Sequence, residues 1–332
     1  MPELRREPVV GRWVIIDSDY PKGPKDFPKE DNTPTRQEIC PFCPGREERT
    51  PKEVDAVRAP ESLPDSPGWL VRTVPNKFPV LITDGIFSKE GIGVYDQMTG
   101  IGAHEVLIES PDHEKTLAEL EAEEFRQVIN QYHSRHCRLS QEGRFKYVAI
   151  FKNFGASAGA TVEHTHSQII ALPMVPKTVL EELKGAENYH LNRGRCVFCD
   201  IIFQEYQDKE RIIAENSTFL AFCPYAPRYA FETWIIPKGH SADFADTDQA
   251  TRADLAQILQ HVLKMVKNVL GNPSYNYYLH TAPNGYANPS CYHWHIEIIP
   301  KLTRSVGFEW GTGLHIVPTL PQEAARFLKG GT

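Results

Sequence analysis

Two histidines one residue apart, His164 and His166, stand at the start of an apolar run that also carries Gln168. On a β-strand, residues two apart point to the same face, so these three side chains are expected on one side of a strand. A neutral imidazole has a reference pKa of about 6.5 and can act as a nucleophile at neutral pH. We therefore interpret His166 as a nucleophile and Gln168 as a neutral hydrogen-bond donor beside it.

The small-residue segment just upstream, residues 153–161, indicates the electrophile. Its glycines would let backbone N–H groups approach an anion, as in loops that cradle phosphate. Neutral donors suit a phosphoryl centre with a single charge, attacked by the imidazole to give a phospho-histidine type intermediate. The alternative is a hydrogen-bonded interior histidine followed by a simple turn. Besides His166, the candidates in this region are Asn153, Gly155, Ser157, Gly159, Thr161 and Gln168, and the expected catalytic residues are His166, Gln168 and Thr161.

Four of the seven cysteines form two Cys-x-x-Cys pairs, Cys40 with Cys43 and Cys196 with Cys199. This spacing is typical of metal ligands. A redox pair would instead be expected at the start of a helix that follows a strand, and the sequence indicates that context for neither pair.

Each pair is followed by two histidines at nearly equal separations, which indicates an internal duplication. His113 and His164 are 51 residues apart, and His240 and His293 are 53 apart. Thiolate and imidazole are the ligands that Zn²⁺ prefers in a closed tetrahedral site, so two structural zinc sites are predicted. The expected ligand sets are Cys40, Cys43, His113 and His164 in the first half, and Cys196, Cys199, His240 and His293 in the second.

The elements that must position these residues repeat in the same order in both halves: a strand, a turn to a histidine, a helix, a strand and the His-x-His strand. Apolar residues recurring at three and four predict helices over residues 117–139 and 250–270. We expect an α+β fold of two histidine-triad-like halves, each an antiparallel sheet with packed helices. The expected domains are 1–175, which carries the site, and 176–332, a degenerate copy that begins with a connecting helix.

Composition limits the classes of partner. The chain has 332 residues, a net charge of −7 and scattered basic residues, so a nucleic-acid partner is not expected. Its apolar runs fall short of the roughly 18 residues that span a bilayer, and its first residues lack a signal-peptide pattern. We therefore expect a cytoplasmic protein without a membrane partner.

At these residues the sequence resembles the histidine triad superfamily, and within it the galactose-1-phosphate uridylyltransferase family, over essentially the whole chain. Further motifs carrying the resemblance are Asn76-Lys-Phe78-Pro and Ser110-Pro-Asp-His113. The resemblance implies a homodimer in which His166 attacks the α-phosphorus of a nucleoside diphosphate sugar. Sugar 1-phosphate leaves, and a second sugar 1-phosphate then accepts the nucleotidyl group. It also implies that Asn76 and Phe78 line the base and ribose pocket.

Several positions depart from the galactose enzymes. Thr165 stands where they have proline, and Ser167 where they usually have an aromatic residue. These residues, and a C-terminal segment 307–313, resemble instead a branch that includes a plant ADP-glucose phosphate adenylyltransferase. The aligned N-terminal stretch 20–24 lacks the two arginines that contact nucleotide in many relatives. An ADP-sugar enzyme with the same mechanism is therefore the first alternative, and a non-catalytic, zinc-stabilised nucleotide-binding module is the second.

The second half differs at the site itself, where Glu297 replaces Gln168. A carboxylate would repel phosphate, so this copy is expected to be inactive. His104 has no assigned role. His280 and His295 fall where metal ligands occur in some galactose enzymes, so they compete with the second cysteine pair for the second metal site, and we prefer the cysteines.

Overall fold

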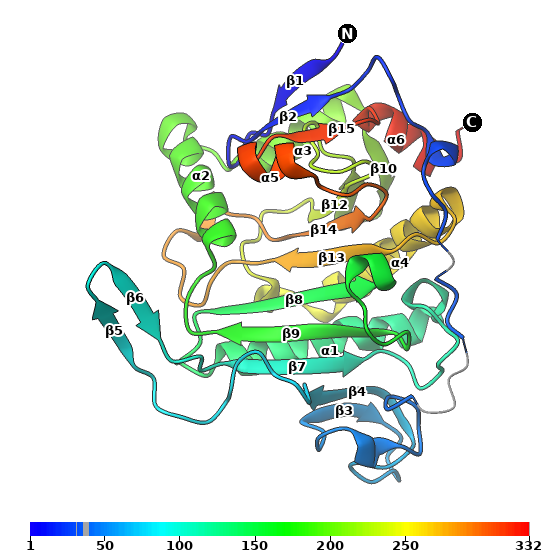
Figure 1. Cartoon of the computed structure of the whole chain (residues 1–332), viewed down its shortest axis with the longest axis vertical. Coiled ribbons are helices and arrows are strands. Elements are labelled where there is room, and N and C mark those ends of the chain that lie inside the picture. The colour runs from blue at the N-terminus through cyan, green and yellow to red at the C-terminus, as the bar shows by residue number, and fades with distance from the viewer. Residues whose placement is uncertain (31, 36–39, 332) are drawn as a thin grey trace.

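The computed structural model describes residues 1–30, 32–35 and 40–331. Within these residues, ten strands form one continuous antiparallel sheet (Figure 1). In spatial order they are β10 (Ile212–Glu215), β11 (Phe219–Phe222), β12 (Thr233–Pro237), β14 (His295–Pro300), β13 (Tyr275–His280), β8 (Tyr147–Phe154), β9 (His166–Leu172), β7 (Ala103–Ile108), β4 (Trp69–Pro75) and β3 (Asp55–Arg58).

The two halves meet at the centre of this sheet, where β8 pairs antiparallel with β13. On each side of that seam the strands follow one another in the same chain order, so β8, β9, β7, β4 and β3 correspond to β13, β14, β12, β11 and β10. The expected duplication is therefore present in the topology, and the α+β class is confirmed. The halves do not form separate sheets, because β8 and β13 join them edge to edge.

Helices α1 (Ala122–Ser140), α4 (Gln249–Leu270) and α6 (Pro321–Leu328) cover one face of the sheet (Figure 1). α4 begins after Asp248, whose side chain accepts a hydrogen bond from Thr251 N, and it ends at Gly271, which has φ +75°. The helix predicted over residues 250–270 is confirmed. The one predicted over 117–139 is partly right, because a 3-10 turn at Leu117–Glu119 precedes α1.

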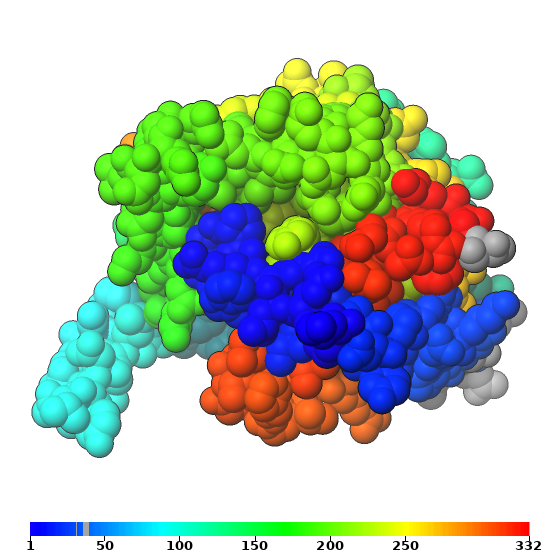
Figure 2. All heavy atoms as spheres, turned by 90° about the horizontal axis from the view of Figure 1, so that it is seen from above, coloured from blue at the N-terminus to red at the C-terminus, as the bar shows by residue number. Residues whose placement is uncertain are grey.

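The opposite face is covered unevenly. Over the C-terminal half it packs against α2 (Lys177–Arg193), α3 (Val197–Asp208) and Val9 of the N-terminal segment. Figure 2 shows the N-terminal segment lying beside these two helices. Over β7, β8 and β9, the described part of the chain places only the short 3-10 turn Ala156–Ala158 in front of the sheet in Figure 1, so this face of the N-terminal half is the more open one.

The remaining elements lie at the periphery. A small sheet joins β1 (Glu3–Arg6), β2 (Trp13–Ile16) and β15 (His315–Val317), and α5 (Gly307–Thr312) precedes β15. Strands β5 (Lys89–Ile92) and β6 (Tyr95–Met98) form a hairpin that projects from the body (Figures 1 and 2). Among the described residues, no helix combines the length and apolar character needed to cross a membrane.

Candidate active site and metal centres

His166 is the first residue of β9, and it faces the open side of the sheet together with Gln168. His164 lies in the bend just before β9, so the expectation that it belongs to the strand is wrong. The Nδ1 atom of His166 is 2.8 Å from the carbonyl oxygen of His164 and donates to it. This contact leaves Nε2 of His166 as the ring nitrogen with a free lone pair.

Two contacts further constrain His166. The ring of Phe42 meets it edge to face, with centroids 5.3 Å apart. Lys152 Nζ donates to the carbonyl oxygen of His166 at 2.9 Å from the other side of the sheet. Burial lowers the pKa of His166, and the positive charge of Lys152 lowers it further. The imidazole is therefore neutral at neutral pH, as a nucleophile requires.

Gln168 is connected to Asn76 through a residue that the sequence left without a role. His104 Nε2 lies 2.8 Å from Gln168 Oε1 and 3.1 Å from Asn76 Nδ2. The predicted substrate-binding residues Asn76 and Gln168 are thus both neighbours of the same histidine ring nitrogen. Phe78, which is 81% exposed, lies two residues beyond Asn76 at the surface, where its ring is available for stacking.

The small-residue loop is held by contacts from the second half of the chain. Asn276 Nδ2 donates to Asn153 Oδ1 at 2.8 Å and to the carbonyl oxygen of Ala158 at 2.9 Å. Gly155 has φ +81°, and a Cβ there would lie 2.1 Å from Ser274 Oγ, so this position requires glycine. Asn153 is therefore a loop anchor as well as a predicted substrate contact.

The other candidates in the loop differ in exposure and contacts. Ser157 donates to the carboxylate of Glu30, so its hydroxyl is already engaged. Gly159, with φ +88°, and Thr161 are exposed. Their predicted roles in binding phosphate remain predictions.

Thr165 and Ser167 point to the face of the sheet opposite His166. Both hydroxyls donate at 2.5 Å to the buried carboxylate of Glu109, which also receives Lys152 Nζ. Thr165 and Ser167, two of the positions noted above as departures from the galactose enzymes, therefore complete a buried polar cluster on the face opposite His166.

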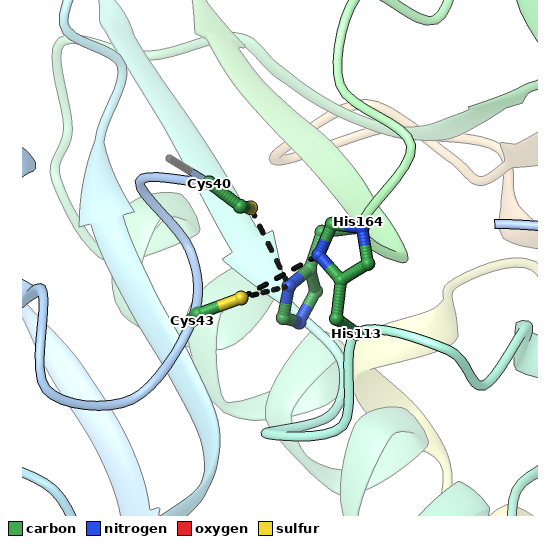
Figure 3. A group of neighbouring side chains, drawn as sticks. All are labelled: Cys40, Cys43, His113 and His164. Atoms are coloured by element: carbon green, nitrogen blue, oxygen red, sulfur yellow. Dashed lines mark hydrogen bonds between the residues drawn. The ribbon is translucent and has the colours of Figure 1, made fainter. Parts of the chain in front are cut away.

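The first predicted metal ligands converge, as Figure 3 shows for Cys40, Cys43, His113 and His164. Cys43 Sγ lies 3.5 Å from His113 Nδ1 and 3.6 Å from His164 Nδ1. The Nε2 atom of His164 donates to the carbonyl oxygen of Ser110 at 2.7 Å, which fixes the tautomer with Nδ1 directed at the sulfurs. The group fits a tetrahedral Cys2His2 site for Zn²⁺.

The second predicted set also converges, with Cys199 Sγ 3.4 Å from His240 Nδ1 and 3.8 Å from His293 Nδ1. His293 Nε2 donates to the carbonyl oxygen of Pro237 at 2.8 Å, the counterpart of the His164 contact. Cys196 is the N-cap of α3, but α3 follows the helix α2, so the strand-then-helix context of a redox pair is absent at this site, as expected. The histidines favour metal binding over redox chemistry.

His280 and His295 do not compete with these cysteines, because they form a separate group with Glu182. Their rings stack in parallel, with centroids 4.6 Å apart, so their in-plane lone pairs do not converge on one point. The two nitrogens of His280 lie 3.1 Å from Glu182 and 3.2 Å from Glu297, and Arg228 also pairs with Glu297. These contacts are those of a buried ion-pair network.

The second copy of the site differs from the first in two ways: its histidine is covered by neighbouring elements, and Glu297 adds a negative charge. His295 donates from Nδ1 to the carbonyl oxygen of His293 at 3.1 Å and packs against Phe198, as His166 does with His164 and Phe42. However, His295 is also stacked on Trp234 and is 1% exposed beneath α2 and α3. Burial by α2 and α3 could not be foreseen from the Glu297 substitution.

Comparison with known proteins agrees with this geometry. The model of the galactose-1-phosphate uridyl transferase N-terminal domain matches residues 1–176, and that of the C-terminal domain matches residues 182–324. An ADP-glucose phosphorylase from Arabidopsis thaliana is 36% identical, covering 99% of this chain and 92% of its own. A galactose-1-phosphate uridylyltransferase from Thermotoga maritima is 28% identical, covering 99% of this chain and 98% of its own.

Solved structures give the same result. A crystal structure of an ADP-glucose phosphorylase from Arabidopsis thaliana with bound ADP-glucose has a TM-score of 0.82 at 33% identity, and all of both chains is covered. A uridylyltransferase structure has a TM-score of 0.77 at 27% identity, covering 99% of this chain and 98% of the other. With both halves matched by the family's two domains, the chain belongs to the galactose-1-phosphate uridyl transferase family.

Proposed function

We propose that this protein transfers a nucleotidyl group between a nucleoside diphosphate sugar and a phosphate acceptor, through a nucleotidyl-His166 intermediate. The observation that carries the proposal is the 2.8 Å hydrogen bond from His166 Nδ1 to the carbonyl oxygen of His164. It directs the proton to Nδ1 and leaves Nε2 as an unprotonated nucleophile on the open face, with Gln168 beside it.

The proposed reaction has two displacements at the same phosphorus. His166 Nε2 forms a bond to the α-phosphorus as the bond from that phosphorus to the bridging oxygen breaks, and sugar 1-phosphate leaves. A phosphate oxygen of the acceptor then forms a bond to phosphorus as the bond to Nε2 breaks, which restores neutral His166. Gln168, Thr161 and the loop N–H groups stabilise charge on the phosphoryl oxygens.

The first candidate reaction moves UMP between a UDP-hexose and a hexose 1-phosphate, as in galactose metabolism. It is supported by the family match to both halves of the chain and by relatives named galactose-1-phosphate uridylyltransferase. Asn76 and Phe78 are the proposed contacts to the nucleoside.

The second candidate moves AMP from an ADP-sugar to phosphate or a sugar phosphate. It is favoured by the 36% identity to the plant ADP-glucose phosphorylase, against 28% for the Thermotoga maritima enzyme. Thr165 and Ser167 do not decide between the two, because both hydroxyls face the buried carboxylate of Glu109.

Intact-mass measurement tests these alternatives. The protein is incubated with UDP-glucose or with ADP-glucose, and His166→Gly is the control. A UMP-sized adduct on the wild type supports the first candidate, and an AMP-sized adduct supports the second. A wild-type protein that acquires neither adduct would overturn the proposed function in favour of a non-catalytic nucleotide-binding module.

We propose that the two Cys2His2 groups hold structural Zn²⁺ ions. With four protein ligands at each site, the ion supplies structural constraint and no open position for water. In the first site it would fix the loop that carries Phe42 and the bend before His166. Metal analysis of the purified protein should find two zinc ions per chain, and a value far below two would contradict the assignment.

A cytoplasmic homodimer is proposed as the assembly. The projecting β5–β6 hairpin exposes Ile92, Val94 and Tyr95, and an isolated hairpin of this kind gains stability from a covering partner. Sedimentation analysis should give the mass of two chains, and a monomer would contradict this. We also propose residues 1–175 as the domain with the site and 176–332 as the degenerate copy.

A further inference from the structure

His104 lies on β7, between β4, which ends at Pro75 just before Asn76, and β9, which carries Gln168. It is 7% exposed and faces the same side of the sheet as His166. Besides the contacts of Nε2 to Gln168 and Asn76, its Nδ1 atom is 3.2 Å from the backbone nitrogen of Val80. Each ring nitrogen of this buried imidazole therefore has a defined neighbour.

These neighbours determine the tautomer of His104. The backbone N–H of Val80 can only donate, so Nδ1 must accept and cannot carry a proton in the neutral ring. The proton is then on Nε2. Two groups lie next to Nε2. The side-chain oxygen of Asn76 accepts from the backbone N–H of Phe78 at 2.9 Å, so its NH2 group, 3.1 Å from Nε2, is a donor and cannot accept the proton. Gln168 Oε1, the nearer neighbour at 2.8 Å, is therefore the acceptor for Nε2–H.

The tautomer in turn fixes the amide of Gln168. Its oxygen is engaged by His104, so the NH2 group is the end left to donate to a ligand. A glutamine turned by half a rotation would present a carbonyl oxygen to the phosphoryl group and repel it. We propose that His104 is a positioning residue that keeps the donor end of Gln168 directed at the phosphoryl oxygens during nucleotidyl transfer.

The degenerate half shows what replaces this contact when the donor is lost. Trp234 opposes Glu297 across the strands as Val106 opposes Gln168, which puts Glu232 at the position equivalent to His104. A carboxylate there cannot donate to Glu297, and Arg228 and His280, which lie elsewhere in this half, pair with Glu297 instead. A histidine at position 104 is thus present in the half that has Gln168, whose amide must be oriented, and is absent from the equivalent position in the half that has Glu297.

The inference rests on the proposed function, and a double-mutant cycle on adduct formation tests it. Gln168→Leu is expected to slow nucleotidyl transfer to His166 about a hundredfold, as for loss of one oxyanion donor. His104→Phe removes the donor while keeping a ring, and is expected to slow the same step about tenfold with little change in KM. In the Gln168→Leu background, His104→Phe should cause no further loss.

A conservative variant and a direct measurement complete the test. His104→Gln can donate from its amide to Gln168 and is expected to recover most of the rate. Effects of His104→Phe that multiply with those of Gln168→Leu, or that change KM alone, would overturn the inference. A wild type that forms no adduct would contradict the proposed function instead.

Nitrogen-15 NMR of histidine-labelled protein reads the tautomer without turnover. The spectrum of the wild type is compared with that of His104→Gln to identify the His104 signals. A ring protonated at Nε2 is the expected result, and protonation at Nδ1 would overturn the inference even if His104→Phe proved too unstable for kinetics.

Discussion

Lys152 Nζ lies 2.5 Å from Glu109 Oε2, and neither side chain is more than 1% exposed. The pair is directly behind the strand that carries His166, and Lys152 also donates to the carbonyl oxygen of His166. A carboxylate at this depth is stable because the hydroxyls of Thr165 and Ser167 donate to it as well. His166, the proposed nucleophile, thus has behind its strand a charge pair that the sequence pattern did not reveal.

Removal of one partner of this pair should be costly. Lys152→Met leaves the carboxylate of Glu109 buried without its cation, and it is expected to lower the free energy of unfolding by about 3–5 kcal/mol. The double variant Lys152→Met with Glu109→Gln removes both charges and should be more stable than the single variant. Urea unfolding measures both. A double variant that is less stable than Lys152→Met would contradict this account.

Thr165 and Ser167 are expected to affect stability and not nucleotide choice. Ser167→Ala and Thr165→Val each remove one hydrogen bond to Glu109, with an expected cost of about 1–3 kcal/mol because the acceptor is charged. The ratio of adduct-formation rates with UDP-glucose and ADP-glucose should stay that of the wild type. Phe78→Ala serves as the comparison that lowers both rates. A reversed nucleotide preference in either hydroxyl variant would disprove the prediction.

The parts of the site that could be predicted are those where chemistry restricts residue types. Cys40 and His164 could be paired because a zinc site needs such ligands at such spacings. The role of His104 could not be predicted in this way, because a single histidine on a strand belongs to no motif. Its role depends on which strands lie beside β7. The two-residue period of a strand could have predicted that Thr165 points to the opposite face from His166. It could not have identified Glu109 as the neighbour of Thr165.

The fold could also be predicted only in part. Local periodicity predicts the duplicated order of strands and helices, and the helices α1 and α4 lie where that periodicity placed them. The pairing of β8 with β13 could not be predicted from periodicity, because strands with similar patterns of polar and apolar residues can pair with several different partners. Nor did the position of α2 follow from its sequence, although α2 is what buries His295 and separates the degenerate copy from solvent.

The two cysteine pairs should differ in what their loss affects. Cys40→Ser is expected to lower zinc content by about one ion per chain and to slow adduct formation about tenfold or more, since Phe42 packs on His166 from the same loop. Cys196→Ser should lower zinc content equally and lower thermal stability, while adduct formation by the folded protein persists. Equal loss of adduct in both variants would contradict this division.

One nucleotidyl group per chain is the expected stoichiometry. His295→Gln should retain adduct formation, whereas His166→Gly abolishes it, because His295 is buried and faces the carboxylate-bearing cluster. The cost of His295→Gln is expected in stability, at about 1–3 kcal/mol, from the lost stacking on Trp234 and His280. Two adducts on one wild-type chain, or loss of the adduct in His295→Gln, would be inconsistent with an inactive second copy.

The network around His280 predicts a dependence of stability on pH. Burial opposes its charged form, but the carboxylates of Glu182 and Glu297 raise the pKa of His280 to about 10, and the charge of Arg228 and the ring of His295 complete its surroundings. A folded-state pKa above the unfolded value of about 6.5 means that the stabilisation is fully present below about pH 6.5 and is lost as the pH rises toward 10.

The expected slope in that window is a loss of up to about 1.4 kcal/mol of unfolding free energy per pH unit. Urea unfolding at about pH 6.5, 8 and 9.5 measures it. The variant His280→Gln keeps the shape and a donor but cannot titrate, so its unfolding free energy should be lower than that of the wild type at the first pH and approach it at the last. A constant difference between the two proteins across these pH values would show that His280 is not charged in the folded state.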